Sequence, residues 1–393
     1  MNKTRNEKKC ARVAFIGVGA FISTHHLLTV RDCPYTEIAA IADLDKSRLQ
    51  SHAAKMSVGY ITSDYHKILD DPAIDIVIIG TKQNLHAKMI VECLNVGKWV
   101  LCEKPMAETI DETKMVLAAE KQSTGRLAIG FNRRFAPAYQ ETLRLMQNVK
   151  KPWYINYRLM FPSPQKNATN SFYSKHERIL YEGCHILDLI SWMFGSGPER
   201  VFMSGDRFLN NTCILEYPEG SRVSLICGSM GSYAHWKEYM EIFGSYTSIT
   251  VSDFIDMRVR GFKGEYDRLY GAYRQEHNDD LFTYGFDFYE SYKMKKILEQ
   301  EDEWKPFGMV LEDVRRPTPY QFDPKTFTDL NPDSWNFVGD KGWEGSVQHF
   351  ARSFLDGTVP RNADGAAGAL STQIALTLLK SLETGLPQCV VGQ

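Results

Sequence analysis

The strongest constraint on the fold is a regular alternation of short apolar runs with helical patterns from residue 11 to residue 131. The apolar runs are short enough to be strands and occupy residues 11–16, 37–42, 75–80, 99–102 and 127–131. Patterns typical of helices separate them, for example at residues 45–56 and 110–121. Strands that alternate with helices form a parallel sheet covered on both faces. We therefore expect a doubly wound α/β domain over residues 1–133.

The first strand of this domain leads into a glycine turn typical of dinucleotide-binding proteins. Gly17 and Gly19 follow the strand directly, and a helical pattern begins soon after them. Glycines in such a turn let the backbone approach a pyrophosphate closely. Ile22 replaces the third glycine of the full pattern, so the match is incomplete. The turn and the alternating strands together predict a Rossmann domain.

A carboxylate at the end of the second strand strengthens this prediction. Asp43 stands 24 residues after Gly19. A carboxylate there can accept hydrogen bonds from the ribose hydroxyls of the adenosine half and would repel a 2′-phosphate. The next residue is Leu44 rather than an arginine, which favours NAD over NADP as the cofactor. The alternative is that Asp43 caps the helix that follows.

The apolar run at 99–102 ends abruptly in Glu103, Lys104 and Pro105. The packing of a buried strand does not require charged residues at its end. Ligands of open α/β sheets lie outside the carboxyl ends of the strands. Lys104 is therefore predicted to be an active-site group. The alternative is a solvated Glu-Lys pair at an ordinary strand end.

After a helical pattern at about 137–148, the periodicity changes to that of strands. Residues 153–160 are aromatic and strand-like, and further strands are expected at 201–205, 212–217, 222–230, 238–243 and 248–251. We expect residues 134–393 to form an α+β domain for substrate binding and oligomerisation, with an open, mainly antiparallel sheet. Residues 257–340 are charged and aromatic, and the sequence predicts no role for them. Helical patterns resume at about 343–350 and 363–384.

The stretch from Tyr181 to Gly195 predicts a buried helix with polar residues at its start. Apolar residues recur at helical spacing, while Glu182, His185 and Asp188 share one face at intervals of three. Buried polar groups cost free energy unless they are paired, so these residues require an explanation. A histidine here is either a structural core residue or a functional group. The neighbouring glycine and carboxylates favour a functional group.

Together these motifs resemble the glucose–fructose oxidoreductase, inositol dehydrogenase and rhizopine catabolism (Gfo/Idh/MocA) family. The likeness covers about residues 11–255 and 343–386, and it rests on Gly17-Val18-Gly19, Asp43, Thr81 to His86, Glu103-Lys104-Pro105, Phe131 to Phe135 and Gly183 to Asp188. The resemblance implies a nicotinamide-dependent dehydrogenase acting on a sugar, a cyclitol or a sugar derivative. It also implies that Lys104 reaches the reacting hydroxyl and that His185 is the acid/base.

The resemblance assigns the remaining candidate residues by position. Catalysis is expected from Lys104, His185, Glu182 and Tyr181. Cofactor binding is expected from Gly17, Gly19, Phe21, Ile22, Asp43, Thr81, Gln83, His86, Glu103 and Lys104. Substrate binding is expected from Lys104, Arg133, Asp188 and His185, with Asp188 orienting the substrate or His185. No metal is expected.

Three departures from the family pattern affect these assignments, and the first is Ile22 where a small residue is common, which changes how the helix approaches the pyrophosphate. Many relatives carry an aspartate four residues before the histidine, where this chain has Tyr181 with Glu182 beside it. One of these two residues must then complete the site. The usual Thr-Pro-Asn segment is Thr81-Lys82-Gln83 here, which changes the contacts expected with the nicotinamide.

The chemistry of the two principal groups agrees with the roles that the resemblance implies. Oxidation of a secondary alcohol needs a base near the hydroxyl with a pKa close to the working pH, and histidine meets this requirement. A lysine cation stabilises the developing alkoxide. The alternatives are a glycosidase or lyase that uses NAD transiently, without net consumption, and a non-catalytic NAD-binding sugar sensor.

Composition narrows the partners and the compartment. A formal net charge of −2 gives no electrostatic case for binding nucleic acid or an anionic membrane. The eight cysteines show no zinc-like spacing, which is typical of reduced thiols in a cytosolic protein. Residues 1–9 are polar, and no apolar stretch of about 18 residues occurs. We expect a cytoplasmic protein. The family resemblance implies a homo-oligomer that pairs through the sheet of the C-terminal domain, since an exposed sheet face would need a partner.

Overall fold

The computed structural model describes residues 10–160, 176–229, 237–264, 266–270 and 339–390. Its packing divides the chain into two compact units. The first unit comprises Met1–Phe135, Leu180–Ser196 and Gly342–Leu376, and the second comprises Ala136–Ile179, Gly197–Lys341 and Thr377–Gln393. Two segments from late in the chain thus pack with the first unit, whereas the expected domains divide the chain once, after residue 133.

The described strands of the first unit form a parallel six-stranded sheet in the order β3-β2-β1-β4-β5-β6. Their bounds are Ala11–Ile16 for β1, Thr36–Ala42 for β2, Tyr60–Thr62 for β3, Ile76–Ile79 for β4, Trp99–Cys102 for β5 and Leu127–Ile129 for β6. The chain moves outward from β1 to β3 and then returns to β4 beside β1. Ligands of such sheets bind at the carboxyl ends of the strands where this reversal occurs. The predicted Rossmann fold is confirmed.

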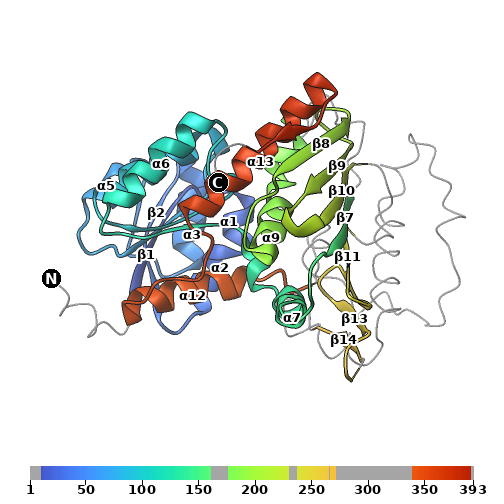
Figure 1. The fold of residues 1–393 in the computed structure, drawn as a ribbon. Coiled ribbons are helices and arrows are strands. Elements are labelled where there is room, and N and C mark those ends of the chain that lie inside the picture. The colour runs from blue at the N-terminus through green and yellow to red at the C-terminus, as the bar shows by residue number, and fades with distance from the viewer. Residues whose placement is uncertain (1–9, 161–175, 230–236, 265, 271–338, 391–393) are drawn as a thin grey trace, which may run out of the picture. The chain divides into compact units, whose positions relative to one another are not determined.

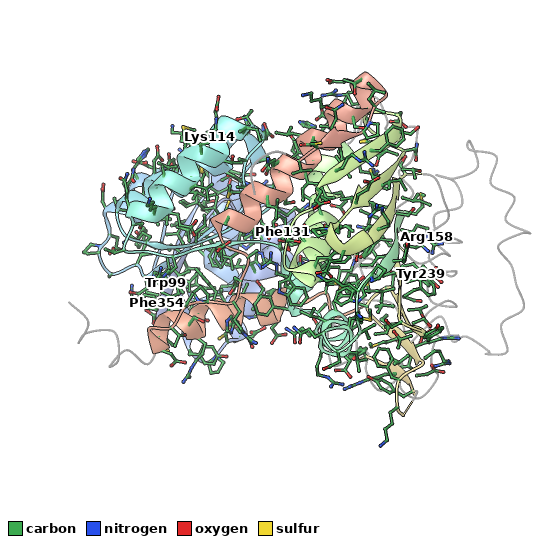
Figure 2. All side chains as sticks on the ribbon, in the orientation of Figure 1. Trp99, Lys114, Phe131, Arg158, Tyr239 and Phe354 are labelled. Atoms are coloured by element: carbon green, nitrogen blue, oxygen red, sulfur yellow. The ribbon has the colours of Figure 1, made fainter. Side chains whose placement is uncertain are left out.

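Helices cover both faces of this sheet, as Figure 1 shows for α5 and α6 on one side and α12 on the other. The helices of the first unit are α1 (Ala20–Thr24), α2 (His26–Asp32), α3 (Lys46–Lys55), α4 (His66–Asp70), α5 (His86–Asn95), α6 (Ile110–Gln122) and α12 (Trp343–Asp356). Phe354 of α12 packs edge-to-face on Trp99 of β5 with ring centroids 5.4 Å apart (Figure 2). A helix about 240 residues later in the sequence therefore completes one face of the nucleotide-binding sheet.

Two further helices lie at the unit boundary, which falls within the first of them, between Ile179 and Leu180. These are α8 (Arg178–Tyr181) and α9 (Cys184–Phe194), separated by Glu182 and Gly183. The sequence predicts one helix from residue 181, and the structure starts it at Cys184. Gly195 ends α9 in the left-handed conformation, with φ of 74°. Glu182 therefore lies in the turn before the helix rather than on its face.

The described strands of the second unit form a nine-stranded sheet in the order β14-β13-β12-β11-β7-β10-β9-β8-β15. The bounds are Tyr154–Met160 for β7, Arg200–Gly205 for β8, Asn211–Glu216 for β9, Arg222–Gly228 for β10, Glu238–Gly244 for β11, Thr247–Ser252 for β12, Asp256–Arg260 for β13, Tyr266–Leu269 for β14 and Gln388–Cys389 for β15. Strand β7 runs parallel to β10, and the other neighbours are antiparallel. This confirms the expected mainly antiparallel sheet.

Helix α7 (Pro137–Met146) belongs to the second unit, and α13 (Gly365–Thr384) ends within it. Strands β13 and β14 place the start of the unassigned segment 257–340 in this sheet, while residues 271–338 lie outside the described residues. No helix in the described part of the chain combines the length and apolar character needed to cross a bilayer. The same residues contain no group of three or more His, Cys, Asp or Glu side chains arranged to hold a metal ion.

Candidate cofactor and active site

The glycine turn after β1 has the conformation that its sequence requires. Gly17 has φ of +83°, and a Cβ at this position would lie 2.8 Å from the carbonyl oxygen of Gly80. Its N–H donates a 2.8 Å hydrogen bond to the carbonyl of Ala42, which joins the turn to β2. A Cβ on Gly19 would meet nothing within 4 Å. The turn is therefore open at Gly19, as close approach of a pyrophosphate to the backbone requires.

Asp43 is held at the end of β2 with its carboxylate fixed by the backbone. Its Oδ2 accepts the N–H of Val18 at 2.9 Å, and its Oδ1 accepts the N–H of Asp45 at 2.9 Å. Burial raises the pKa of Asp43, but these two bonds and the Arg48 guanidinium outweigh burial and hold it below its usual value. Asp45, not Asp43, is the N-cap of α3, because its side chain accepts the N–H of Arg48. The alternative interpretation of Asp43 as a cap is wrong.

Glu103 is buried and binds a histidine of the glycine-turn region. Its Oε1 lies 2.7 Å from Nε2 of His26, and a Cβ on Gly130 would come within 2.8 Å of the same oxygen. Burial raises the pKa of Glu103, but the His26 bond and the charge of Lys104 outweigh burial and lower that pKa. Glu103 thus connects the end of β5 to α2, and Gly130 leaves room for it.

Lys104 extends from the end of β5 to the residues that precede α9. Its Nζ donates to the carbonyl oxygen of Tyr181 at 2.8 Å and to Oε2 of Glu182 at 3.3 Å. The Lys104 and Glu182 side chains are 19% and 11% exposed, so the pair is only partly screened by solvent. The structure therefore brings together Lys104 and Glu182, which lie 78 residues apart in the sequence.

The Tyr181 hydroxyl points to a different partner. It donates a hydrogen bond to Oε1 of Glu108. Of the two residues that could replace the family aspartate, Glu182 is the one whose side chain contacts Lys104, while Tyr181 contributes its backbone carbonyl.

His185 lies in the first turn of α9 and is 7% exposed. Its ring meets Phe131, at the end of β6, edge-to-face with centroids 6.0 Å apart (Figure 2 labels Phe131). His185 is the third residue after Glu182, so the contact between Glu182 and Lys104 brings the end of β5 to the start of the helix that carries the histidine.

Asp188 follows His185 by nearly one turn and is engaged by Arg134. Nε and Nη2 of Arg134 donate to the two carboxylate oxygens at 2.9 and 2.5 Å. Burial raises the pKa of Asp188, and the bonds from Arg134 oppose this rise. Sequence reasoning missed Arg134. The sequence feature that could have pointed to it is the Arg133-Arg134 pair directly after a strand. An aspartate predicted to be buried, such as Asp188, needs a cation as its partner.

The loop after β4 is joined to Pro105 through His86. This buried ring approaches the carbonyl of Pro105 at 2.8 Å through Nδ1 and that of Thr81 at 3.3 Å through Nε2. Gln83 begins a short 3-10 helix, Gln83–Leu85, and is partly exposed. His86 thus holds two loops together, whereas the family resemblance implies that it binds cofactor.

The remaining predicted residues lie in the same unit. Ile22 is 2% exposed and lies in the core, and Arg133 is 3% exposed. Phe21 packs edge-to-face on Trp343, with ring centroids 5.9 Å apart. The cofactor and substrate roles of these residues stay predictions.

Comparison with known proteins gives the family. Residues 11–131 match the GFO_IDH_MocA model, described as an oxidoreductase family with an NAD-binding Rossmann fold. The Rossmann domain at residues 11–131 thus matches the Gfo/Idh/MocA oxidoreductase family. The family resemblance and the choice of NAD as cofactor are thereby confirmed.

Relatives within the family include two proteins of Bacillus subtilis (strain 168). The uncharacterized oxidoreductase YrbE is 29% identical over 244 residues, 58% of this chain and 70% of the relative. The scyllo-inositol 2-dehydrogenase (NAD(+)) is 29% identical over 209 residues, 52% of this chain and 60% of the relative. The chain thus matches only part of the length of these relatives.

Solved structures share the fold over nearly the whole chain. The scyllo-inositol dehydrogenase from Lactobacillus casei with bound NAD(H) and scyllo-inositol superposes with a TM-score of 0.71. The identity is 16%, with 98% of this chain and 100% of the other covered. At this identity the likeness concerns the fold.

Proposed function

We propose that this chain is a Gfo/Idh/MocA oxidoreductase, an NAD-dependent dehydrogenase that oxidises a secondary hydroxyl of a cyclitol or a related sugar. The observation that carries the proposal is the position of the Lys104 amine, which is held by the Tyr181 carbonyl and the Glu182 carboxylate just before His185. Inositol dehydrogenases among the relatives support the cyclitol class over other polyols. NAD also fits the residues present, because Gly19 is open and Asp43 is ionised.

Gly17, Gly19 and Asp43 would hold the cofactor, which when bound accepts a hydride from the carbinol carbon. His185 takes the hydroxyl proton on a ring nitrogen. Lys104 stabilises the negative charge that develops on the same oxygen, because a cation in a partly buried site interacts strongly with an alkoxide. A contribution of about 10²–10⁴-fold is typical of a positioned acid/base group.

Glu182 positions Lys104 and keeps its charge. A carboxylate within ion-pair distance favours the protonated amine. The Tyr181 carbonyl accepts a second ammonium proton, so a backbone oxygen and a carboxylate together fix the position of the amine. Arg133 would contact the substrate, and Asp188 would contribute indirectly, through Arg134. Because both oxygens of Asp188 accept from Arg134, Asp188 acts by fixing that arginine and the start of α9.

The experiment that tests this proposal is absorbance at 340 nm with NAD and a panel of inositols, free sugars and glycosides, with released aglycone followed in parallel. Accumulation of NADH with inositols or sugars supports the dehydrogenase. Release of aglycone without net NADH would replace it with the enzyme that uses NAD transiently. Absence of both, with NAD bound, would replace it with the sensor.

We further propose that the chain forms a homo-oligomer through the open sheet of the second unit. Four large apolar side chains on its strands are exposed by 37–54%: Tyr154, Ile214, Ile226 and Phe243. Exposed apolar patches of this kind are typical of interfaces between proteins. Light scattering after size-exclusion chromatography should give an oligomer for the wild type and a smaller species for Ile226→Lys. A monomeric wild type would contradict the proposal. The cytoplasmic location stays a prediction.

A further inference from the structure

Arg48 lies against the carboxylate that is expected to bind the adenosine ribose. Its Nη1 atom is 3.1 Å from Oδ2 and 3.4 Å from Oδ1 of Asp43. Its Nη2 atom is 3.5 Å from the Asp45 carboxylate. Among the residues that the structure describes, Arg48 is the cation in ion-pair contact with Asp43. In the sequence Leu44 follows Asp43 directly, whereas Arg48 is five residues further on and reaches the carboxylate from the first turn of α3.

The backbone leaves few acceptor positions free on Asp43. The N–H groups of Val18 and Asp45 each take one carboxylate oxygen at 2.9 Å. A carboxylate offers about four lone-pair sites in all, so Arg48 shares those that remain. The two ribose hydroxyls of NAD would donate to the same sites. Arg48 and the ribose of NAD therefore compete for Asp43.

The effect of Arg48 on a 2′-phosphate is the opposite. A phosphate monoester carries about −1.5 to −2 charges at pH 7, and an isolated Asp43 carboxylate would repel it. A guanidinium matches phosphate in charge and shape. The Arg48 side chain is 42% exposed and can turn from the carboxylate to a phosphate. This movement leaves the cap of α3 intact, because the Asp45 cap accepts the backbone N–H of Arg48.

We propose that Arg48 determines the cofactor specificity of this chain. It neutralises Asp43 and so permits binding of dinucleotides that carry a 2′-phosphate in addition to NAD, while it weakens the binding of NAD by competing for Asp43. The proposal rests on the proposed function, since both require a dinucleotide at the Asp43 site. It predicts that loss of Arg48 changes the two affinities in different directions.

The test is calorimetric titration with ADP-ribose and 2′-phospho-ADP-ribose, which needs no substrate or turnover. The variant is Arg48→Met, which keeps length and helix propensity but removes the charge. The matched control is Lys46→Met, because Lys46 is an exposed cation at the first position of the same helix. We expect Arg48→Met to weaken the binding of 2′-phospho-ADP-ribose by about 10–100-fold, the range for loss of a hydrogen-bonded charged group. ADP-ribose should bind more tightly, because the competitor for Asp43 is gone, and Lys46→Met should preserve the wild-type ratio of the two affinities.

Three results would overturn the proposal. The first is that Arg48→Met weakens the binding of both ligands by the same factor. The second is that Arg48→Met binds both ligands with the wild-type affinities. The third is that the wild type binds ADP-ribose but not its 2′-phosphate form. If the wild type binds neither ligand, the proposed function itself fails.

Discussion

The side chain of Ile22 occupies the space that a side chain on Gly80 would need. A Cβ on Gly80 would lie 2.1 Å from Cγ1 of Ile22. Ile22 stands where the dinucleotide fingerprint usually has its third glycine, which allows close packing of helix against strand. Here the glycine is on the strand side, after β4, and the larger residue is on α1. The incomplete fingerprint is thus compensated within the first unit.

This packing predicts coupling between the two positions. Gly80→Ala should destabilise the protein by about 1–3 kcal/mol, the usual cost of overpacking. When Ile22 is replaced by alanine, the methyl group added by Gly80→Ala has room. The double variant should therefore lose less free energy of unfolding than the two single variants lose together, by at least about 0.5 kcal/mol. Urea denaturation of all four proteins measures the coupling. Strict additivity would show that the two side chains do not share this space.

Glu182 and Tyr181 should differ in their effect on catalysis. Glu182→Gln removes the carboxylate that contacts Lys104, so kcat should fall by about tenfold or more, in line with loss of a charged hydrogen bond. Tyr181→Phe removes the bond to Glu108 and retains the carbonyl that binds Lys104, so kcat should change by less than about threefold. Steady-state kinetics at saturating NAD compares them. A larger loss of kcat in Tyr181→Phe than in Glu182→Gln would reverse the assignment.

The buried pair of Arg134 and Asp188 should be essential for stability. Their side chains are 13% and 1% exposed. Asp188→Asn leaves Arg134 without its counter-charge and should cost about 3–5 kcal/mol, whereas replacing both residues, as in Arg134→Met with Asp188→Leu, should recover much of the loss. Thermal and urea unfolding measure both. If Asp188→Asn is as stable as the wild type, the carboxylate serves the substrate rather than the fold.

His86 should make stability depend on pH in a mild range. Burial lowers the pKa of His86, although the carbonyl of Pro105 opposes this shift. The unfolded chain therefore takes up a proton near pH 6.5 before the folded protein does, and stability falls as the pH drops from about 6.5 toward the lowered folded pKa. His86→Gln should lack this component, giving a shallower decline of Tm between pH 7 and pH 5. Parallel Tm curves for the two proteins would contradict a neutral, buried His86.

The strands and their terminal residues could be predicted because local sequence determines them. The run at 99–102 forms β5, with the lysine at its end, and Asp43 follows β2 as expected. Short apolar runs bounded by polar residues need no knowledge of distant contacts. The Gly17 conformation was equally predictable, since its positive φ agrees with its place in the turn.

The pairs that complete the site could not be predicted in the same way. Glu103 binds His26, which is 77 residues away in the sequence, and Asp188 binds Arg134 from 54 residues away. Sequence periodicity gives the face on which a residue lies but not its partner across the fold. The break before Cys184 was also missed, because Glu182 keeps the three-residue spacing of His185 and Asp188 and so fits the same helical pattern.

The most direct test of the central claim is the rate of NADH formation at 340 nm by the wild type, Lys104→Met and His185→Ala with the best substrate from the panel. We predict that each variant lowers kcat by about 10²–10⁴-fold, the range for groups that transfer a proton or stabilise the developing negative charge in the transition state. Calorimetry should find that NAD binding is nearly unchanged. Turnover close to the wild-type rate in either variant would contradict the roles of Lys104 and His185 in the reaction.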